Sequence, residues 1–203
     1  MTKRVLYLLL GTVLTSLGIV AVLHCGLGAF SITLANKAIA KWCGFDLAIA
    51  NLITEGAMLA YATYKGEGVG LTAISSLTLG SITISLFDKI LPYSPWMAIL
   101  FFVAIIGWAL QGKACFGHGA SNILTEALMK TTGRSLVLIR TIIDVVFLII
   151  AFIGYPYMIT WLTILVTFGT APAMKYIYKL FRYEPVDVQH SYLIKGKSSH
   201  GHL

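Results

Sequence analysis

Long apolar stretches alternate with short polar segments along most of the chain. A helix needs about 20 predominantly apolar residues to cross a bilayer, within a range of about 17–25. Six stretches reach or approach this length: residues 5–23, 47–64, 70–87, 96–110, 136–153 and 158–177. The pattern therefore predicts an all-α integral membrane protein with about six transmembrane helices.

The chain also repeats parts of itself. Gly26-Leu27-Gly28-Ala29 recurs as Gly117-His118-Gly119-Ala120. Seven further residues recur at a shift of 89: Ala38, Lys41, Gly44, Leu47, Ile53, Thr78 and Gly80 match Ala127, Lys130, Gly133, Leu136, Ile142, Thr167 and Gly169. A four-helix bundle with loose loops would not explain matches between loops as well as spans. We expect two three-helix repeats, residues 1–92 and 93–182, followed by a cytoplasmic polar tail at 183–203. Because three is odd, the second repeat should have inverted topology in the membrane.

Each repeat contains a glycine-rich segment, at 26–44 and 117–133, that is too long for a turn and too mixed for a span. We expect a short or re-entrant helix after a flexible turn that includes Gly28 or Gly119. The start of such a helix carries a partial positive charge and suits an anionic or carbonyl-bearing ligand. Ser31 and Asn122 are aligned there and are candidate ligand contacts. The alternative is a surface helix in which Ser31 or Asn122 is only a cap.

Polar residues interrupt two of the apolar stretches at matching places. Asn51 aligns with Arg140, and Glu55 aligns with Asp144. Within each stretch the two residues are four apart and share one helix face. A charge near the bilayer midplane costs at least about 2.5 kcal/mol, so these groups must be paired, hydrated or protonated. Arg140 could bridge Asp144 on its own helix and Glu55 across the repeat axis. The alternative is a purely structural salt bridge.

Composition and charge agree with a membrane protein. The chain is 58% hydrophobic and only 11% charged, whereas soluble domains carry about 25% charge. With the N-terminus inside, three of the assigned basic residues lie outside: Lys37, Lys41 and Lys89. The cytoplasmic set is Lys3, Arg4, Lys65, Lys113, Lys130, Arg134, Lys175, Lys179, Arg182, Lys195 and Lys197. This distribution follows the positive-inside rule and predicts a cell-membrane protein with both termini cytoplasmic. It also explains the net charge of +7 without nucleic acid, which we do not expect as a partner.

The cysteines and histidines give no sign of a metal or catalytic centre. The sequence has no C-x-x-C, H-E-x-x-H or G-x-S-x-G pattern, so we expect no metal, no cofactor and no enzymatic activity. A disulfide between Cys25 and Cys43 stays open. His118, inside the second glycine motif, could titrate near neutral pH, or it could be a solvated loop residue.

The glycine segments resemble those of the YczE/YyaS/YitT group of small bacterial membrane proteins. That group carries a repeated Gly-Leu-Gly-Pro-Trp-Asp-like segment followed by a short helix. The corresponding residues here are Gly26-Leu27-Gly28-Ala29-Phe30-Ser31 and Gly117-His118-Gly119-Ala120-Ser121-Asn122, the latter ending at Thr132-Gly133. The resemblance extends from about residue 4 to residue 182. Ala29 and Ala120 replace the family's proline, and Ser31 and Asn122 replace its aspartate. The resemblance implies a cytoplasmic-membrane protein with a suspected transport role.

Together these features predict a small secondary carrier or facilitator for an anionic or zwitterionic solute. Its central site would lie at the repeat interface. The alternatives are a non-transporting accessory or scaffold protein of the membrane, and a channel. The expected partners are the lipid bilayer and a small solute, with a homodimer left open. The sequence names neither the solute nor a coupling ion.

Overall fold

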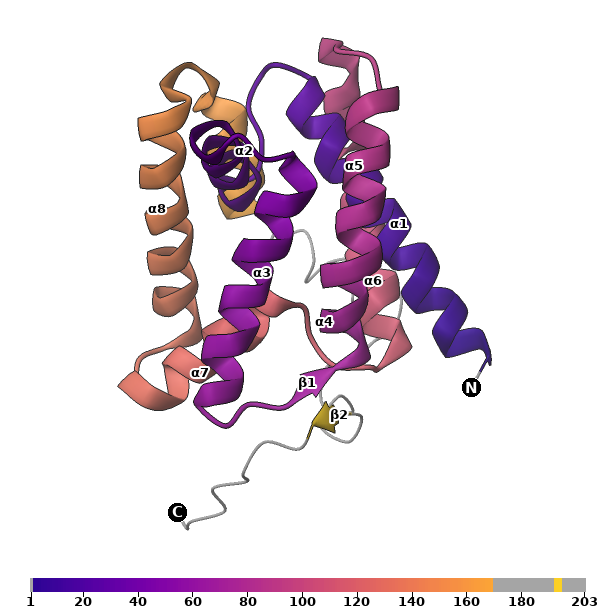
Figure 1. The fold of residues 1–203 in the computed structure, drawn as a ribbon, viewed down its shortest axis with the longest axis vertical. Coiled ribbons are helices and arrows are strands. Elements are labelled where there is room, and N and C mark those ends of the chain that lie inside the picture. The colour runs from indigo at the N-terminus through magenta and orange to yellow at the C-terminus, as the bar shows by residue number, and fades with distance from the viewer. Residues whose placement is uncertain (1, 170–191, 195–203) are drawn as a thin grey trace.

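The computed structural model describes residues 2–169 and 192–194 (Figure 1). In this part of the chain, the first half contains α1 (Thr2–His24), α2 (Ser31–Cys43), α3 (Leu47–Tyr64), α4 (Leu71–Ser75), the π-helical turn η1 (Ser76–Gly80) and α5 (Ser81–Ile90). The second half contains the 3₁₀ turn η2 (Pro95–Leu100), α6 (Phe101–Ala114), α7 (Ala120–Thr132), α8 (Leu136–Gly154) and the 3₁₀ turn η3 (Pro156–Met158). Residues 161–169 are again helical. The short strands β1 (Val69–Gly70) and β2 (Tyr192–Ile194) pair antiparallel, with Val69 opposite Ile194.

Three continuous helical segments are long and apolar enough to cross a membrane: Thr2–His24, Leu71–Ile90 and Pro95–Ala114. A fourth span results if α2 and α3, which meet at a bend of 114°, count as one broken span. Helix α8 is 19 residues long and continuous, and Arg140 and Asp144 are charged residues within its apolar sequence. These helices confirm an all-α fold and indicate a multi-pass membrane protein. The last expected span, 158–177, lies partly outside the described residues, as does most of the tail at 183–203.

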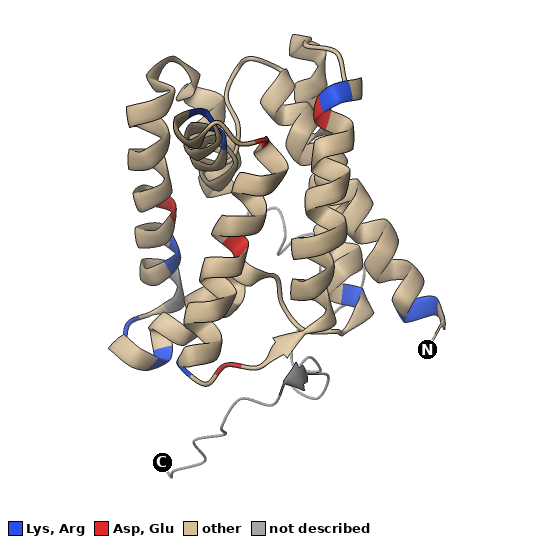
Figure 2. Cartoon of the chain, viewed as in Figure 1, with Lys and Arg blue, Asp and Glu red and all other residues tan. Residues whose placement is uncertain are grey.

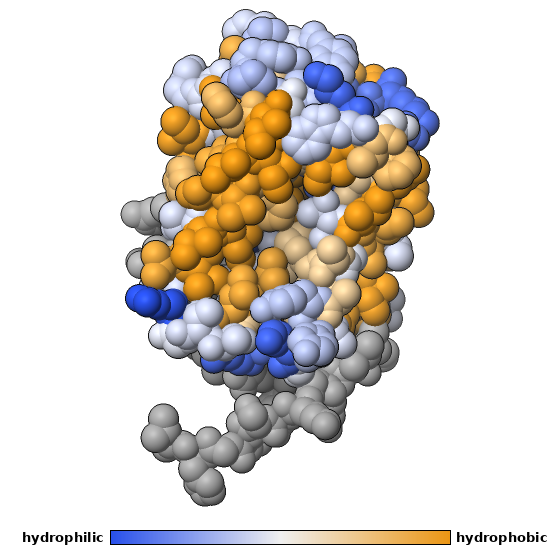
Figure 3. Space-filling view, turned by 60° about the vertical axis from the view of Figure 1, so that its left-hand side comes forward, coloured by the Kyte–Doolittle hydropathy of each residue, from blue (hydrophilic) through white to orange (hydrophobic). Residues whose placement is uncertain are grey.

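The surface supports the same conclusion. Large apolar side chains are exposed around the middle of the molecule, among them Ile82, Phe102 and Ile149. Figure 3 shows this apolar surface between more polar ends. Aromatic side chains are exposed near the turns that follow α5 and α8: Tyr93, Trp96, Tyr157 and Trp161. Exposed tyrosine and tryptophan side chains near such turns are typical of a membrane–water interface.

The two expected short helices are present, and each ends at a glycine. Helices α2 and α7 both have 13 residues. Gly44 follows α2 with φ 69°, and Gly133 follows α7 with φ 66°. Glycine adopts this left-handed conformation without the penalty that a Cβ atom brings, so it ends a helix efficiently. In Figure 1, α2 lies near the upper end of the molecule and α7 at the lower end.

Backbone features recur at a spacing of 89 residues. Ser31 and Ala120 begin α2 and α7, and Leu47 and Leu136 begin α3 and α8. Positive φ angles recur at the same spacing: Gly26 (71°) with Cys115 (55°), and Gly28 (119°) with Gly117 (94°). The alignment of Gly28 with Gly119, and of Ser31 with Asn122, is therefore wrong by two residues. The two glycine motifs have identical residues at a spacing of 91, whereas their positive φ angles recur at a spacing of 89. At that spacing Cys115 occupies the position equivalent to Gly26.

Contacts between the halves are reciprocal. Helices α1 and α6 pack closely, and a methyl group on Gly18 would clash with Ala104 while one on Gly107 would clash with Thr15. Gly18 and Gly107 are 89 residues apart, as are Thr15 and Ala104. Helix α2 packs against α8, and α7 packs against α3. The helix pairs α2–α8 and α7–α3 are therefore equivalent at the spacing of 89 residues.

The loop carbonyls repeat this exchange. The N–H of Thr72 donates to the carbonyl of Phe116 at 3.2 Å. The hydroxyl of Thr160 donates to the carbonyl of Leu27. Leu27 and Phe116 are again 89 residues apart. Each glycine turn is therefore bound to a threonine at or just before the start of a helical segment in the opposite half.

Candidate functional site

A half-buried ion pair lies on α8, with the acid buried and the arginine 35% exposed. Asp144 is only 6% exposed, and its Oδ2 accepts a hydrogen bond from Nε of Arg140 at 3.2 Å. The two residues are four apart, so one helix turn brings them onto the same face. The expected ion pair within this helix is therefore present. Because most of α8 is apolar, the pair stands out as the main polar feature of the helix.

The first turns of both short helices bind this pair. Ser31, the first residue of α2, donates to Oδ1 of Asp144 at 3.0 Å. Nη1 of Arg140 donates to Oγ of Ser121 at 3.1 Å and to Oδ1 of Asn122 at 3.3 Å. Ser121 and Asn122 lie in the first turn of α7. One ionic network, which we call the α8 network, therefore joins α2, α8 and α7.

Neither short helix uses these side chains as a cap. The N-cap residues are Phe30 and Gly119, and neither helix has a side-chain cap hydrogen bond. Ser31 is 2% exposed and directs its hydroxyl to Asp144. The interpretation of Ser31 as a surface cap is therefore wrong. The Asp144 carboxylate instead lies beside the start of α2, where the helix dipole favours a negative charge.

A second network, without charge, joins α2 to α3 and α5. Nδ2 of Asn36 donates to Oδ1 of Asn51 at 3.0 Å, and Nδ2 of Asn51 donates to Oγ of Ser81 at 3.2 Å. All three residues are buried. We call this the α3 network. It contains the candidate Asn51 but no hydrogen bond to Arg140 or Asp144 among the described residues.

Glu55 lies one helix turn after Asn51. Its Oε2 atom is buried and has no hydrogen-bond partner among the described residues. The ion pairs of this part of the chain do not include one between Glu55 and Arg140. The expected bridge across the repeat axis is therefore absent, because Arg140 is bound by Asp144 and by the start of α7. A buried carboxyl oxygen without a partner is costly in an apolar setting, which keeps Glu55 a functional candidate.

The two candidate glycines behave differently. Gly28 has φ 119°, and a methyl group there would clash with Thr160 and Thr163. The next N–H, of Ala29, donates to Oγ1 of Thr163 at 3.3 Å. Gly119 has φ −70° and open space where a Cβ would lie. The prediction that Gly119 matches Gly28 is wrong, because Gly117 makes the equivalent turn.

His118 lies apart from the α8 network. Its Nε2 is 3.5 Å from Oε1 of Glu126, and its side chain is 31% exposed. Nearby, Nζ of Lys130 is 2.7 Å from Oε2 of Glu67, which ties α7 to the turn after α3. His118 is therefore part of a charged cluster at the lower end of the molecule, beside Glu126 rather than solvated on its own.

The cysteines form no disulfide, and the described residues hold no candidate metal centre. Cys25, Cys43 and Cys115 all lack a disulfide partner. Cys25 is buried and donates from Sγ to the carbonyl of Val22 at 2.9 Å, whereas Cys43 is exposed. No group of three His, Cys, Asp or Glu residues within the described ranges could hold a metal ion.

Sequence reasoning missed several residues of these networks. Ser121 binds Arg140, while Asn36 and Ser81 bind Asn51. Ser121 stands directly before the candidate Asn122, so its polar character at a helix start was a usable signal. Asn36 and Ser81 had none beyond being polar within apolar segments. No protein-family model, curated protein or solved structure matches this chain.

Proposed function

We propose that the protein is a small secondary carrier or facilitator for an anionic or zwitterionic solute. Its central site is the α8 network, at the interface of two inverted three-helix repeats in a six-span chain. The observation that carries the proposal is that the buried Asp144 and its half-buried partner Arg140 are bound by the first turns of both short helices. Charged groups inside membrane proteins are rare and mark substrate or ion pathways.

The inverted duplication is supported by the spacing of 89 residues and by the reciprocal contacts between the halves. In carriers built this way, the starts of short or broken helices from both repeats point to the solute near the midplane. Ser31 and Ser121–Asn122 belong to helix starts of opposite repeats, and they meet on Asp144 and Arg140. A solute anion that binds Arg140 would compete with Asp144, and this competition couples binding to a rearrangement of both short helices.

Charge at the ends of the molecule supports an orientation with the N-terminus inside. The start of α1 and the ends of α3 and α6 lie at the lower end of the molecule, with α7 (Figure 1). These segments carry Lys3, Arg4, Lys65, Lys113 and Lys130. Figure 2 shows basic residues gathered at the two ends, away from the middle of most helices. The richer basic end is assigned to the cytoplasm.

A non-transporting accessory protein is the main alternative, because the α8 network also holds three helices together. A channel is the other alternative. The resemblance to the YczE/YyaS/YitT group favours transport, and a homodimer is compatible with either role. Flux separates these functions: an accessory protein gives none, and a channel gives flux that does not saturate with solute concentration.

The test is solute uptake into proteoliposomes, with a panel of small organic anions and amino acids as probes. We expect saturable uptake that falls at least tenfold in Asp144→Asn and in Arg140→Gln. Arg134→Gln is the matched control, because Arg134 is an exposed arginine two residues before α8. Size-exclusion profiles establish that each variant is folded. Absence of uptake by the wild-type protein, or unchanged uptake in both network variants, would contradict the proposal.

A further inference from the structure

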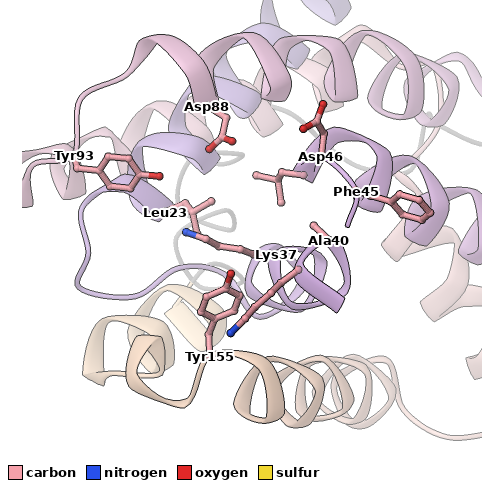
Figure 4. A pocket seen from close by; sticks show the side chains of 10 residues that line it. Leu23, Lys37, Ala40, Phe45, Asp46, Asp88, Tyr93 and Tyr155 are labelled. Carbon is pink, nitrogen blue, oxygen red and sulfur yellow. The ribbon is translucent and has the colours of Figure 1, made fainter. Parts of the chain in front are cut away.

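A second polar site lies at the upper end of the molecule, away from the α8 network. It is a pocket of about 310 Å³ between α2, the start of α3, the end of α5 and the turn after α8. Its polar lining consists of Lys37, Lys41, Asp46, Asp88, Tyr93 and Tyr155 (Figure 4). This volume is at the lower end of the range for ligand pockets, about 300–1,000 Å³. The pocket therefore suits a small molecule.

Opposite charges converge in this pocket. Figure 4 shows the Lys37 ammonium, the Asp88 carboxylate and the hydroxyls of Tyr93 and Tyr155 directed toward a common space near Leu23. Nζ of Lys37 is 5.6 Å from the centre of the Tyr155 ring, and Nζ of Lys41 is 4.7 Å from it. The ion pairs of the described residues include neither lysine. Both ammonium groups therefore remain available to a carboxylate.

Asp88 is held in place by a buried histidine. Nε2 of His24 lies 2.8 Å from Oδ1 of Asp88, and Nδ1 of His24 lies 3.0 Å from the carbonyl of Leu91. The ring of Tyr93 stacks on that of His24, with centroids 4.0 Å apart. Partial burial, followed by the nearby Asp88 charge, raises the pKa of Tyr93, so its hydroxyl keeps its proton. The pocket thus presents a fixed carboxylate and a neutral hydroxyl opposite two lysines.

At the opposite end of the molecule, the equivalent charged residues of α7 form ion pairs. At a spacing of 89, Lys37 and Lys41 correspond to Glu126 and Lys130 of α7. Lys130 is bound to Glu67 at 2.7 Å, and Glu126 lies 3.5 Å from His118. The equivalent positions of α2 carry two lysines beside an open pocket instead. Among the described residues, lysines of the short helix without an ion pair are therefore specific to the upper end, where Asp88 is paired with His24 instead.

We propose that this pocket binds a small zwitterion that carries one carboxylate and one ammonium group, such as a free amino acid. Lys37 and Lys41 bind the carboxylate, and Asp88, which His24 orients, binds the ammonium group. Binding at this site is independent of transport. Its role as the first docking site of a carrier rests on the proposed function, since α2 carries both the pocket lysines and Ser31 of the α8 network.

The test is isothermal titration of the full chain in lipid nanodiscs. The probes are L-alanine, L-serine and L-glutamine, with propionate and ethylamine as ligands that carry only one of the two charges. We expect an amino acid to bind at least tenfold more tightly than propionate or ethylamine. Lys37→Met and Asp88→Asn should each weaken binding at least tenfold. Lys89→Met is the matched control, because Lys89 is exposed and does not line this pocket.

Three outcomes overturn the pocket proposal: no amino acid binds, propionate binds as tightly as the amino acids, or folded Lys37→Met binds like the wild type. Thermal unfolding establishes folding, and Lys37→Met decides the matter if Asp88→Asn does not fold. Asp144→Asn separates the two proposals, because it should reduce solute uptake but changes no residue that lines the pocket. Amino-acid binding without flux in the wild type would refute the carrier and leave the pocket intact. Flux without binding at the pocket would refute the pocket alone.

Discussion

The two halves of the molecule use equivalent positions for different chemistry. In the first half, Asn51 binds Asn36 of its own short helix and Ser81 of α5, with no charge involved. In the second half, Arg140 occupies the equivalent position and binds Ser121 of its own short helix. It also binds Asp144, which Ser31 joins from the opposite half. At both positions a side chain of the long helix therefore binds a short helix, but only Arg140 is charged.

The helix starts match at the two positions, whereas the polar groups and their partners differ. A neutral amide chain is satisfied by hydrogen bonds and needs no counter-charge. An arginine in an apolar helix needs an anion, and removal of that anion leaves an uncompensated charge. The second half therefore holds the chemistry that a charged solute can disturb. The first half has the neutral α3 network at the equivalent position, with Glu55 one helix turn after Asn51.

The largest expected effect comes from removal of Asp144. We expect Asp144→Ala to lower the free energy of unfolding by about 2–3 kcal/mol, below the full value for a buried pair because the Arg140 side chain is 35% exposed. Glu55→Ala is the comparison at the equivalent position, and it should cost clearly less because the ion pairs of the described residues do not include Glu55. Denaturant unfolding in detergent micelles measures both. Equal decreases in the free energy of unfolding would show that the two carboxylates contribute equally to stability.

The next effect tests the symmetry of the packing. Gly18→Ala and Gly107→Ala each place a methyl group against the opposing helix, and overpacking of this kind costs about 1–3 kcal/mol. Because the contacts are reciprocal, we expect the two variants to lower the thermal midpoint by similar amounts. Gly56→Ala on α3 is the control, since a methyl group there meets open space. A harmful change at only one of the two glycines would break the proposed equivalence of α1 and α6.

The smallest effect has the opposite sign. Cys115 has φ 55° where its equivalent, Gly26, has φ 71°. A left-handed conformation costs a residue with a Cβ atom about 1–2 kcal/mol, partly offset by the greater freedom of glycine in the unfolded chain. We therefore expect Cys115→Gly to raise stability by about 0.5–1 kcal/mol, and Gly26→Ala to lower it by a similar amount. Cys115→Ala keeps the strained backbone and should bring no gain in the same thermal-unfolding assay.

Several local features were predicted well from the sequence. The stretch 47–64 coincides with α3, and both short helices end at the expected glycines, Gly44 and Gly133. The Arg140–Asp144 pair follows from their spacing on one helix. These features depend on hydropathy, helix period and backbone preference, which are properties of neighbouring residues.

Other features could not be read from neighbouring residues. Gly28 is equivalent to Gly117 rather than Gly119 because the backbone angles match, and the repeated motif Gly-x-Gly-Ala does not indicate this. Ser31 and Asn122 do belong to one network, but Ser31 binds the acid and Asn122 binds the base. Glu55 was expected to share Arg140, yet the ion pairs of the described residues leave it out. These outcomes depend on how helices from distant parts of the chain pack.

The sequence by itself determined an apolar helical chain with a duplicated pattern and a few charges inside its helices. Hydropathy and helix periodicity act over one or two turns, so they can be read along the chain. Only the tertiary structure decided that the two short helices meet on one Arg–Asp pair and that a separate pocket gathers two lysines and Asp88. Such meetings depend on how closely helices from distant parts of the chain pack, as at Gly154 of α8, where a methyl group would clash with Ala38 of α2.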